Sequence, residues 1–206
     1  MLLFTAQLPF SAKLFSSTSP PPKKTSIRER EYLRSPEVLA MIRAAQKVGR
    51  HGVRDGAIIL LMFRHGLRTA ELVALKWTQI DLAGGYIEVH RVKHGRDSIH
   101  PLRSPELRAL RQIQRDYGET SYVFVSERKA PLSTRSIRHI IARAGELADI
   151  PFQVHPHQLR HACGYYLAAQ GHDTRAIQDY LGHKNIHHTV RYTQMSPQRF
   201  ENFWMD

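Results

Sequence analysis

A histidine and an arginine stand three residues apart in the run HQLRH at residues 157–161, directly after Pro156. Proline favours the first turn of a helix, and residues three apart share one helix face, so His157 and Arg160 are expected side by side. The planar fork of an arginine matches two phosphate oxygens, and a histidine beside it can accept or donate a proton. The pair is typical of a phosphate site, although a solvated surface pair has the same spacing.

A second arginine, Arg68, lies in the segment GLRTAEL at residues 66–72. Gly66 is expected to end one helix, which leaves Arg68 at the start of the next, where a helix N-terminus favours an anion. Glu71 follows about one turn later and can hold the Arg68 side chain in position. The alternative is an exposed ion pair, which contributes little to stability.

A histidine and a tyrosine complete the set of reactive side chains. Gly182 is expected to terminate a helix with His183 in the following turn, and Tyr192 comes nine residues later beside Arg191. An unperturbed tyrosine has a pKa of about 10, which neighbouring cations lower, so Tyr192 is a candidate nucleophile. The chain has eight tyrosines, and packing in the core is the alternative for any one of them.

Metal binding is the competing use of the histidines, of which the chain has 13. Ligand-like spacings occur among His155, His157 and His161 and among His183, His187 and His188. No Asp or Glu lies within residues 155–161, and the single cysteine, Cys163, offers no thiolate pair, whereas zinc hydrolase motifs bring an acidic base with the ligands. We therefore expect no metal, and we expect Cys163 to be a packing residue.

The charge balance favours a polyanionic partner. Lys and Arg number 30 against 18 Asp and Glu, which gives a net charge of +12. DNA or RNA is the first candidate. A membrane is excluded because no apolar run reaches the ~20 residues that span a bilayer and because the basic residues form no contiguous block. One cysteine permits no internal disulfide, which fits a cytoplasmic location.

The chain divides into an arm and a domain that must position these residues. Residues 1–28 contain no acidic residue and are rich in Ser and Pro, so a flexible arm is expected there. Residues 29–206 are expected to form one folded domain, since 42% of the chain is hydrophobic and a helical pattern begins at Ser35. Ser35 is the expected helix cap, with Pro36 and Glu37 in the first turn.

The remaining elements are mainly helices beside one small sheet. Periodicity and caps predict helices over residues 57–63, 69–76, 105–117, 134–148, 156–169, 174–181, 187–192 and 197–204. Alternating hydrophobicity predicts a strand over 86–92, a turn over 94–97 and a returning strand over 98–102. The expected fold class is mainly α with a small antiparallel β-sheet, an α+β fold.

Taken in chain order, these segments resemble the boxes of the phage integrase, or tyrosine recombinase, family. The segment around Arg68 resembles the first arginine box, and HQLRH looks like the His-x-x-Arg box. The run LGH at 181–183, followed by Tyr192, resembles the closing segment. The run VKHG at 92–95, with Pro-Leu after a turn, is similar to the hairpin that carries the family's catalytic lysine, here Lys93.

The resemblance covers about residues 30–204 and is closer still to one branch. The runs HPHQLRHACG at 155–164 and IQDYLGHKNIHHTVRYT at 177–193 look like the small fimbrial phase-variation recombinases, which are bacterial DNA inversion enzymes. Larger relatives carry an N-terminal helical domain that closes around DNA, and only the arm is expected in that place here.

The resemblance implies the tyrosine recombinase catalytic-domain fold and a site-specific DNA recombinase that carries out inversion or integration. Six catalytic residues and one supporting residue carry over: Arg68, Lys93, His157, Arg160, His183 and Tyr192, supported by Glu71. The implied partners are double-stranded DNA with inverted-repeat sites and further protomers, which form a tetramer on synapsed DNA. The implied location is the bacterial cytoplasm, at the nucleoid.

The resemblance also implies a role for each side chain. Arg68 and Arg160 hold the non-bridging oxygens while Tyr192 attacks the phosphorus and forms a 3′-phosphotyrosyl bond. His157 accepts the proton of the tyrosine, and His183 donates a hydrogen bond to the phosphate. The number of phosphoester bonds is unchanged, so no ATP, metal or other cofactor is needed.

The leaving 5′-oxygen needs a proton, and the hairpin lysine is its expected source. The turn over 94–97 places Lys93 at a strand end, which favours it over Lys76, Lys129 and Lys184. Two other functions stay open. A type IB topoisomerase shares this chemistry but relaxes supercoils, and a DNA-binding regulator would bind without cleaving.

Overall fold

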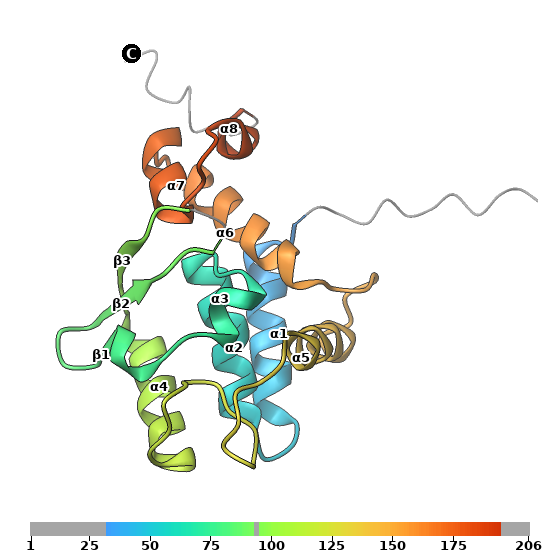
Figure 1. Cartoon of the computed structure of the whole chain (residues 1–206). Coiled ribbons are helices and arrows are strands. Elements are labelled where there is room, and N and C mark those ends of the chain that lie inside the picture. The colour runs from blue at the N-terminus through green and yellow to red at the C-terminus, as the bar shows by residue number, and fades with distance from the viewer. Residues whose placement is uncertain (1–31, 93–94, 195–206) are drawn as a thin grey trace, which may run out of the picture.

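The computed structural model describes residues 32–92 and 95–194, and within them the expected mainly helical fold with one small sheet is confirmed (Figure 1). The helices are α1 Ser35–Lys47, α2 Gly52–His65, α3 Thr69–Val73, α4 Ser104–Tyr117, α5 Thr134–Leu147, α6 Pro156–Ala169, α7 Thr174–Leu181 and α8 His187–Thr193, with one 3-10 turn at Trp77–Gln79. The strands are β1 Ile80–Asp81, β2 Tyr86–Val89 and β3 Ser98–Pro101. None of the described helices is long and apolar enough to cross a membrane.

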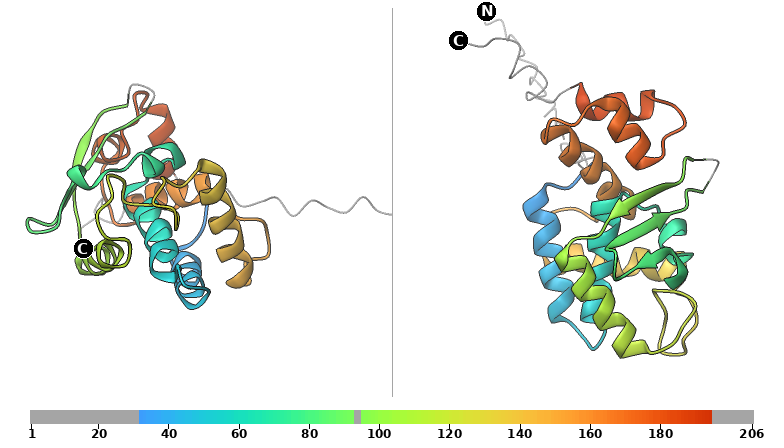
Figure 2. Two further views of the ribbon diagram at one scale, coloured as in Figure 1. Left: turned by 60° about the horizontal axis from the view of Figure 1, so that its bottom comes forward. Right: turned by 90° about the vertical axis from the view of Figure 1, so that its left-hand side faces the viewer.

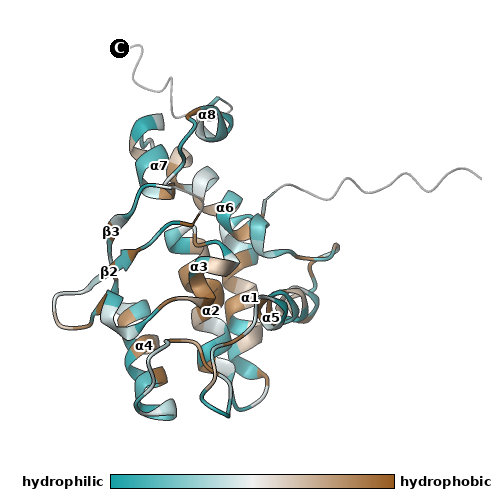
Figure 3. Ribbon diagram, viewed as in Figure 1, coloured by the Kyte–Doolittle hydropathy of each residue, from teal (hydrophilic) through white to brown (hydrophobic). Residues whose placement is uncertain are grey.

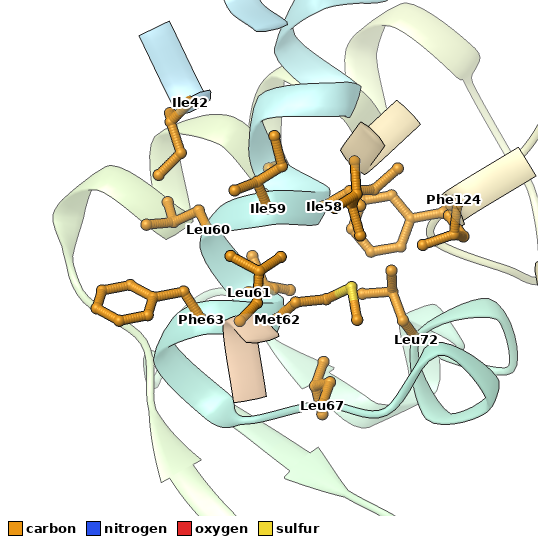
Figure 4. Packing of buried hydrophobic residues seen from close by; sticks show 14 of the residues in the cluster. Ile42, Ile58, Ile59, Leu60, Leu61, Met62, Phe63, Leu67, Leu72 and Phe124 are labelled. Carbon is orange, nitrogen blue, oxygen red and sulfur yellow. The ribbon is translucent and has the colours of Figure 1, made fainter. Parts of the chain in front are cut away.

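Helix α2 is the centre of the main core. Its run AIILLMF at residues 57–63 is apolar on every face (Figure 3), and all seven side chains are buried. Figure 4 shows those from Ile58 to Phe63 among their neighbours. A helix that is apolar all round must be surrounded, and α2 contacts α1, α3, α4, α5 and α6. The helix begins at Gly52 and ends at His65, so it is longer than the expected 57–63.

Two expected helix bounds need correction, the start of α1 and the end of α3. The first residue of α1 is Ser35, so the expected cap lies inside the first turn, and Arg34 is the N-cap. The carboxylate of Glu37 accepts the Arg34 backbone N–H at 2.8 Å, which supplies the capping contact. Helix α3 ends at Val73 rather than at residue 76, and the chain continues through the 3-10 turn.

The three strands form one antiparallel sheet in the order β1-β2-β3. Ile87 pairs with His100 and Val89 with Ser98, which confirms the expected hairpin. Strand β2 ends at Val89 instead of residue 92 because the Arg91 backbone N–H donates to the Asp97 carboxylate at 2.7 Å rather than to a ladder carbonyl. The two-residue strand β1 was not expected.

The C-terminal helices form a separate end of the molecule. Figure 2 shows the sheet and α1 on opposite sides of α2, with α7 and α8 packed at the far end of α6. A second, smaller apolar cluster lies there and includes Cys163, Leu181 and Tyr192. Residues 1–28, Lys93 and the helix expected over 197–204 lie outside the described residues, and so does His94.

Candidate active site

Two helices end at glycines in the left-handed conformation. A backbone carbonyl at each of these helix ends accepts a hydrogen bond from the same arginine. Gly66 follows α2 with φ +58°, and Gly182 follows α7 with φ +64°, as the sequence predicted for both helix ends. Arg160 of α6 donates from Nη1 to the Gly66 carbonyl and from Nη2 to the Leu181 carbonyl, the latter at 2.7 Å. The guanidinium is therefore fixed by two helix C-termini, whose negative ends attract a cation.

Arg160 is buried, with 2% of its surface exposed. Burial lowers its pKa to about 10, and the charges of Arg68 and Arg91 act in the same direction. It stays charged at neutral pH. Helix α6 begins at Pro156 as expected, and the His155 backbone N–H donates to the Gln158 side chain at 2.8 Å.

Arg68 is the N-cap residue of α3, and the expected contact with Glu71 is present. The Glu71 carboxylate accepts the Arg68 backbone N–H at 2.8 Å and its Nη1 at 2.7 Å. The Arg68 side chain is 27% exposed, so part of its fork faces solvent. Burial raises the pKa of Glu71, but the Arg68 backbone hydrogen bond and the charge of Arg91 outweigh it and hold that pKa below its usual value.

Sequence reasoning missed Arg91, which binds the other side of the same carboxylate. Its Nη1 lies 2.9 Å from the second oxygen of Glu71, and its side chain is fully buried. A signal was present: the alternation that buries Ile87 and Val89 also puts residue 91 on the buried face. A basic residue at a core position of a strand needs a partner, and Glu71 is that partner.

Tyr192 of α8 is docked against α6 and is only 2% exposed. Its hydroxyl lies 2.8 Å from Nδ1 of His161, and its ring lies edge-on to Tyr165. Gly164 makes room for the ring, because a Cβ there would lie 2.5–2.7 Å from three ring atoms.

Neighbouring cations lower the pKa of Tyr192, as expected, but burial has the larger effect, so the net shift is upward. Burial raises the pKa to about 12, and Arg160 and Arg191 offset only part of that effect. Desolvation outweighs the cations because it penalises the phenolate directly. The tyrosine is thus stored in its neutral form.

His157 was expected to accept the proton of the tyrosine, but in this structure it is His161 that is hydrogen-bonded to the Tyr192 hydroxyl. His157 is exposed at the mouth of the site, and its ring packs edge-on against His161 at 4.7 Å. Burial lowers the pKa of His161 to about 4, with further contributions from His157 and Arg160, so His161 is neutral at pH 7. Partial desolvation and the charges of Arg160 and Arg68 also lower the pKa of His157. The two histidines are one helical turn apart, and spacing alone does not distinguish which one faces α8.

His183 lies in the turn after α7, as expected, and is buried. Its Nδ1 lies 2.8 Å from the Thr189 hydroxyl, and its ring stacks toward Tyr192 at 6.3 Å. Burial, followed by the charge of Arg160, lowers its pKa to about 3, so the ring is neutral. The structure thus brings Arg68, Arg160, His183 and Tyr192 together from four separate segments.

The remaining sequence predictions concern the single cysteine, the alternative lysines and metal binding. Cys163 is buried, and burial raises the pKa of its thiol to about 12, which confirms a packing residue. Lys76 lies over the Tyr122 ring at 5.8 Å, and Lys129 lines a separate hollow with His51. Among the side chains that the structure describes, no three His, Cys, Asp or Glu are grouped closely enough to hold a metal ion.

Known proteins resemble this chain over most of its length. The phage integrase family profile matches residues 31–199. The type 1 fimbriae regulatory protein FimE of Escherichia coli K12 is 44% identical over 182 residues, which are 85% of this chain and 91% of that protein. FimB of the same strain is 41% identical over 186 residues, which are 88% of this chain and 92% of that protein.

Solved structures share the fold. A crystal structure of XerA recombinase has a TM-score of 0.71 and 31% identity, and the match covers 81% of this chain and 61% of that one. XerH bound to its difH substrate has a TM-score of 0.68 at 19% identity, over 80% of this chain and 50% of that one, which supports the fold alone. The tyrosine recombinase XerA of Thermococcus kodakarensis is 38% identical over 149 residues, or 69% of this chain and 51% of that protein.

Proposed function

The chain belongs to the phage integrase family of tyrosine recombinases, and on that premise we propose that it cleaves and rejoins duplex DNA at specific sites through Tyr192. One observation carries the proposal: Arg68, Arg160 and Tyr192 converge with His183 where α2 and α7 end. A net charge of +12 suits a DNA partner.

The two arginines are the proposed binding groups for the scissile phosphate. Arg160 is already oriented by the Gly66 and Leu181 carbonyls, and Glu71 orients Arg68, so little reorganisation is needed when charge gathers on the phosphate oxygens. Thr189 holds Nδ1 of His183, and the proposed hydrogen bond to the phosphate comes from Nε2.

The tyrosine must leave its resting place before it reacts. At 2% exposure and with a hydrogen bond to His161, the hydroxyl of Tyr192 cannot reach a phosphate, so we infer that DNA binding displaces α8. His157, which is exposed beside His161, is the proposed acceptor of the proton in the displaced state. The bond from the Tyr192 oxygen to phosphorus forms as the bond from phosphorus to the 5′-oxygen breaks.

Lys93 is the proposed donor of the proton to the leaving 5′-oxygen. A 5′-hydroxyl of another strand then attacks the phosphotyrosyl bond, which restores a phosphodiester and releases Tyr192. The exchange conserves the number of bonds and needs no ATP or metal.

Inversion between inverted repeats is the outcome we favour. Similarity over nearly the whole of two type 1 fimbriae regulatory proteins supports a regulatory role, and inversion of a DNA segment can regulate a gene. We propose a tetramer on two synapsed sites at the nucleoid, with residues 1–28 as an arm in front of a catalytic domain over 29–206.

A nicked duplex tests the function. The DNA carries the inverted repeats found beside the protein's own gene, with the nick placed so that the released fragment diffuses away. We expect a covalent protein–DNA adduct on a denaturing gel, in excess EDTA, and none from Tyr192→Phe. Tyr180→Phe is the matched control, since Tyr180 belongs to the same cluster and donates to the Arg64 carbonyl.

Three outcomes would count against the proposal. An adduct that persists in Tyr192→Phe contradicts the nucleophile. Strict dependence on a divalent ion contradicts the metal-free chemistry. Relaxation of a supercoiled plasmid without the repeats indicates a topoisomerase instead.

A further inference from the structure

Arg91 is a buried cation for which the mechanism above has no use. Its side chain is fully buried, and it donates to Glu71 and to three backbone carbonyls: His65 at 3.0 Å, Gly66 at 3.3 Å and Tyr180 at 2.7 Å. These carbonyls belong to the ends of α2 and α7, the same two ends that bind Arg160. Arg91 is therefore a second tie between the helix ends that orient the catalytic arginine.

Arg91 also changes the charge of the site. Glu71 orients Arg68, but a single carboxylate paired with Arg68 alone would cancel its charge. With Arg91 on the other oxygen of Glu71, the three guanidinium groups and one carboxylate leave two net positive charges. A phosphodiester carries one negative charge, and attack by a phenolate brings the transition state to two. The site with Arg91 matches the transition state, whereas without Arg91 it matches the ground state.

We propose that Arg91 is a positioning residue of the DNA-cleavage site, which turns Glu71 toward Arg68, binds carbonyls at the two helix ends that orient Arg160 and supplies the charge that matches the transition state. It acts through these neighbours and not on the DNA, because its side chain is inaccessible to solvent. The inference rests on the proposed function. It predicts that loss of Arg91 slows cleavage without weakening DNA binding.

Three variants separate charge from geometry. Arg91→Met removes the charge but keeps an apolar side chain of similar reach. Arg91→Lys keeps the charge but lacks the fork that bridges Glu71 and the carbonyls. Arg54→Met is the matched control, because Arg54 is also a buried arginine, pairs with Asp55 at 2.8 Å and donates to the Val125 carbonyl, away from the site.

The first measurement is the rate of adduct formation at saturating nicked DNA, together with DNA affinity and melting temperature. We expect Arg91→Met to cleave about a hundredfold more slowly with unchanged DNA affinity. Arg54→Met should lose stability and keep the wild-type rate. Equal rates in wild type and Arg91→Met would overturn the proposal, as would an equal fall in affinity and rate.

The second measurement repeats the assay with a methylphosphonate at the scissile position. This linkage lacks one negative charge, so the charge of Arg91 is no longer needed. We expect the gap between wild type and Arg91→Met to shrink about tenfold on this DNA. Arg91→Lys, which keeps the charge, should gain no such rescue. If Arg91 had only a structural role, the ratio of the wild-type rate to the Arg91→Met rate would be the same on both substrates, which would contradict the proposal.

A third measurement does not depend on cleavage. Inorganic phosphate is titrated into the protein while the ring signals of the histidines are followed by NMR. Arg91→Met should bind phosphate at least tenfold more weakly than wild type (an estimate of about one order of magnitude), and Arg54→Met should match wild type.

If wild type forms no adduct, the proposed function fails, but this titration still tests the role of Arg91. Equal affinities, or no binding by wild type, would overturn the inference. Should Arg91→Met not fold, Arg91→Lys is compared with Arg54→Lys by its rate on both DNAs.

Discussion

Tyr192, the proposed nucleophile, is held by three neighbours that a reacting tyrosine must leave. His161 binds its hydroxyl, Gly164 accommodates its ring, and Tyr165 packs against the ring edge. Each contact stabilises the neutral, buried side chain. On the proposed mechanism, the free energy of undocking is part of the barrier to cleavage.

The contact with Gly164 can be tested by a methyl group. Gly164→Ala should destabilise the protein by about 1–3 kcal/mol, because the added Cβ overlaps the Tyr192 ring. In a Tyr192→Ala background the ring is absent, so Gly164→Ala should lower the free energy of unfolding much less. The two substitutions should therefore be non-additive in a double-mutant cycle. Chemical denaturation of the four proteins measures it. An equal cost in both backgrounds would show that Tyr192 is not what Gly164 accommodates.

Lys93 lies outside the described residues. Its proposed role as proton donor to the leaving 5′-oxygen can be tested with a modified substrate. A 5′-bridging phosphorothiolate has a leaving group that needs no proton. Lys93→Ala should cleave ordinary DNA poorly and the sulfur-substituted DNA nearly as fast as wild type. Single-turnover rates on both substrates decide the matter. Without rescue, Lys184 beside His183 becomes the next candidate.

At the residue scale, the sequence predicts contacts within one short motif better than contacts between motifs that lie far apart in the chain. The pairing of Arg68 with Glu71 follows from a spacing of three residues in one turn. Arg91 lies 20 residues from Glu71 and meets it only because the segment that follows β2 passes beside α3. The choice of His161 over His157 depends on where α8 docks, which no local pattern encodes.

At the scale of elements, the two helix ends that hold Arg160 depend on their glycines. Gly182 has φ +64°, and a Cβ there would lie 2.6 Å from the Arg91 side chain and 2.8 Å from the Arg96 carbonyl. Gly49 has φ +68°, and a Cβ there would meet nothing within 4 Å, so it shows the backbone strain without the contact.

Alanine at these two glycines should therefore differ in effect. Gly49→Ala should cost about 1–2 kcal/mol of backbone strain and leave cleavage unchanged. Gly182→Ala should cost that amount and about 1–3 kcal/mol more for the overlap, and it should impair cleavage because Arg91 and the end of α7 are displaced. Denaturation and adduct assays on both variants provide the comparison. Equal losses of stability would mean that the close approach at Gly182 is relieved at no cost.

Helices with clear caps were predictable, and short strands were not. The expected bounds of α6 and α7 agree with the structure because Pro156 fixes one start and Gly182 one end. Strand β1 has only two residues, too few to show the alternation of apolar and polar side chains that identifies a strand.

At the scale of the whole molecule, the buried neutral His100 joins the sheet to the helical ends. His100 of β3 lies 3.1 Å from His65 of α2, and its ring stacks on Tyr180 of α7 at 3.8 Å. Burial, together with His65 and Arg91, lowers the pKa of His100 to about 3. His183 has the same low value.

These histidines predict the response of stability to acid. An unfolded histidine has a pKa of about 6.5, so below that pH the unfolded chain binds protons that His100 and His183 in the folded chain do not. Their contribution is present above pH 6.5 and is lost as the pH falls toward 3. Each should lower the free energy of unfolding by about 1.4 kcal/mol per pH unit in that range.

Urea denaturation at several pH values between 7 and 4 measures the slope. His100→Gln should reduce it by about one proton, whereas changing the exposed His172 should leave it as it is. A slope that is identical in wild type and His100→Gln would contradict the assignment.

The burial of Tyr192 has a consequence for a cell that carries this protein. A molecule with a net charge of +12 touches chromosomal DNA far more often at random than at its own sites. If Tyr192 is the nucleophile, as proposed, its docked and neutral hydroxyl keeps a chance encounter from bringing a nucleophile to a phosphate. Searching and cutting are thereby separate events, and the chromosome can be scanned continuously without accumulating broken strands.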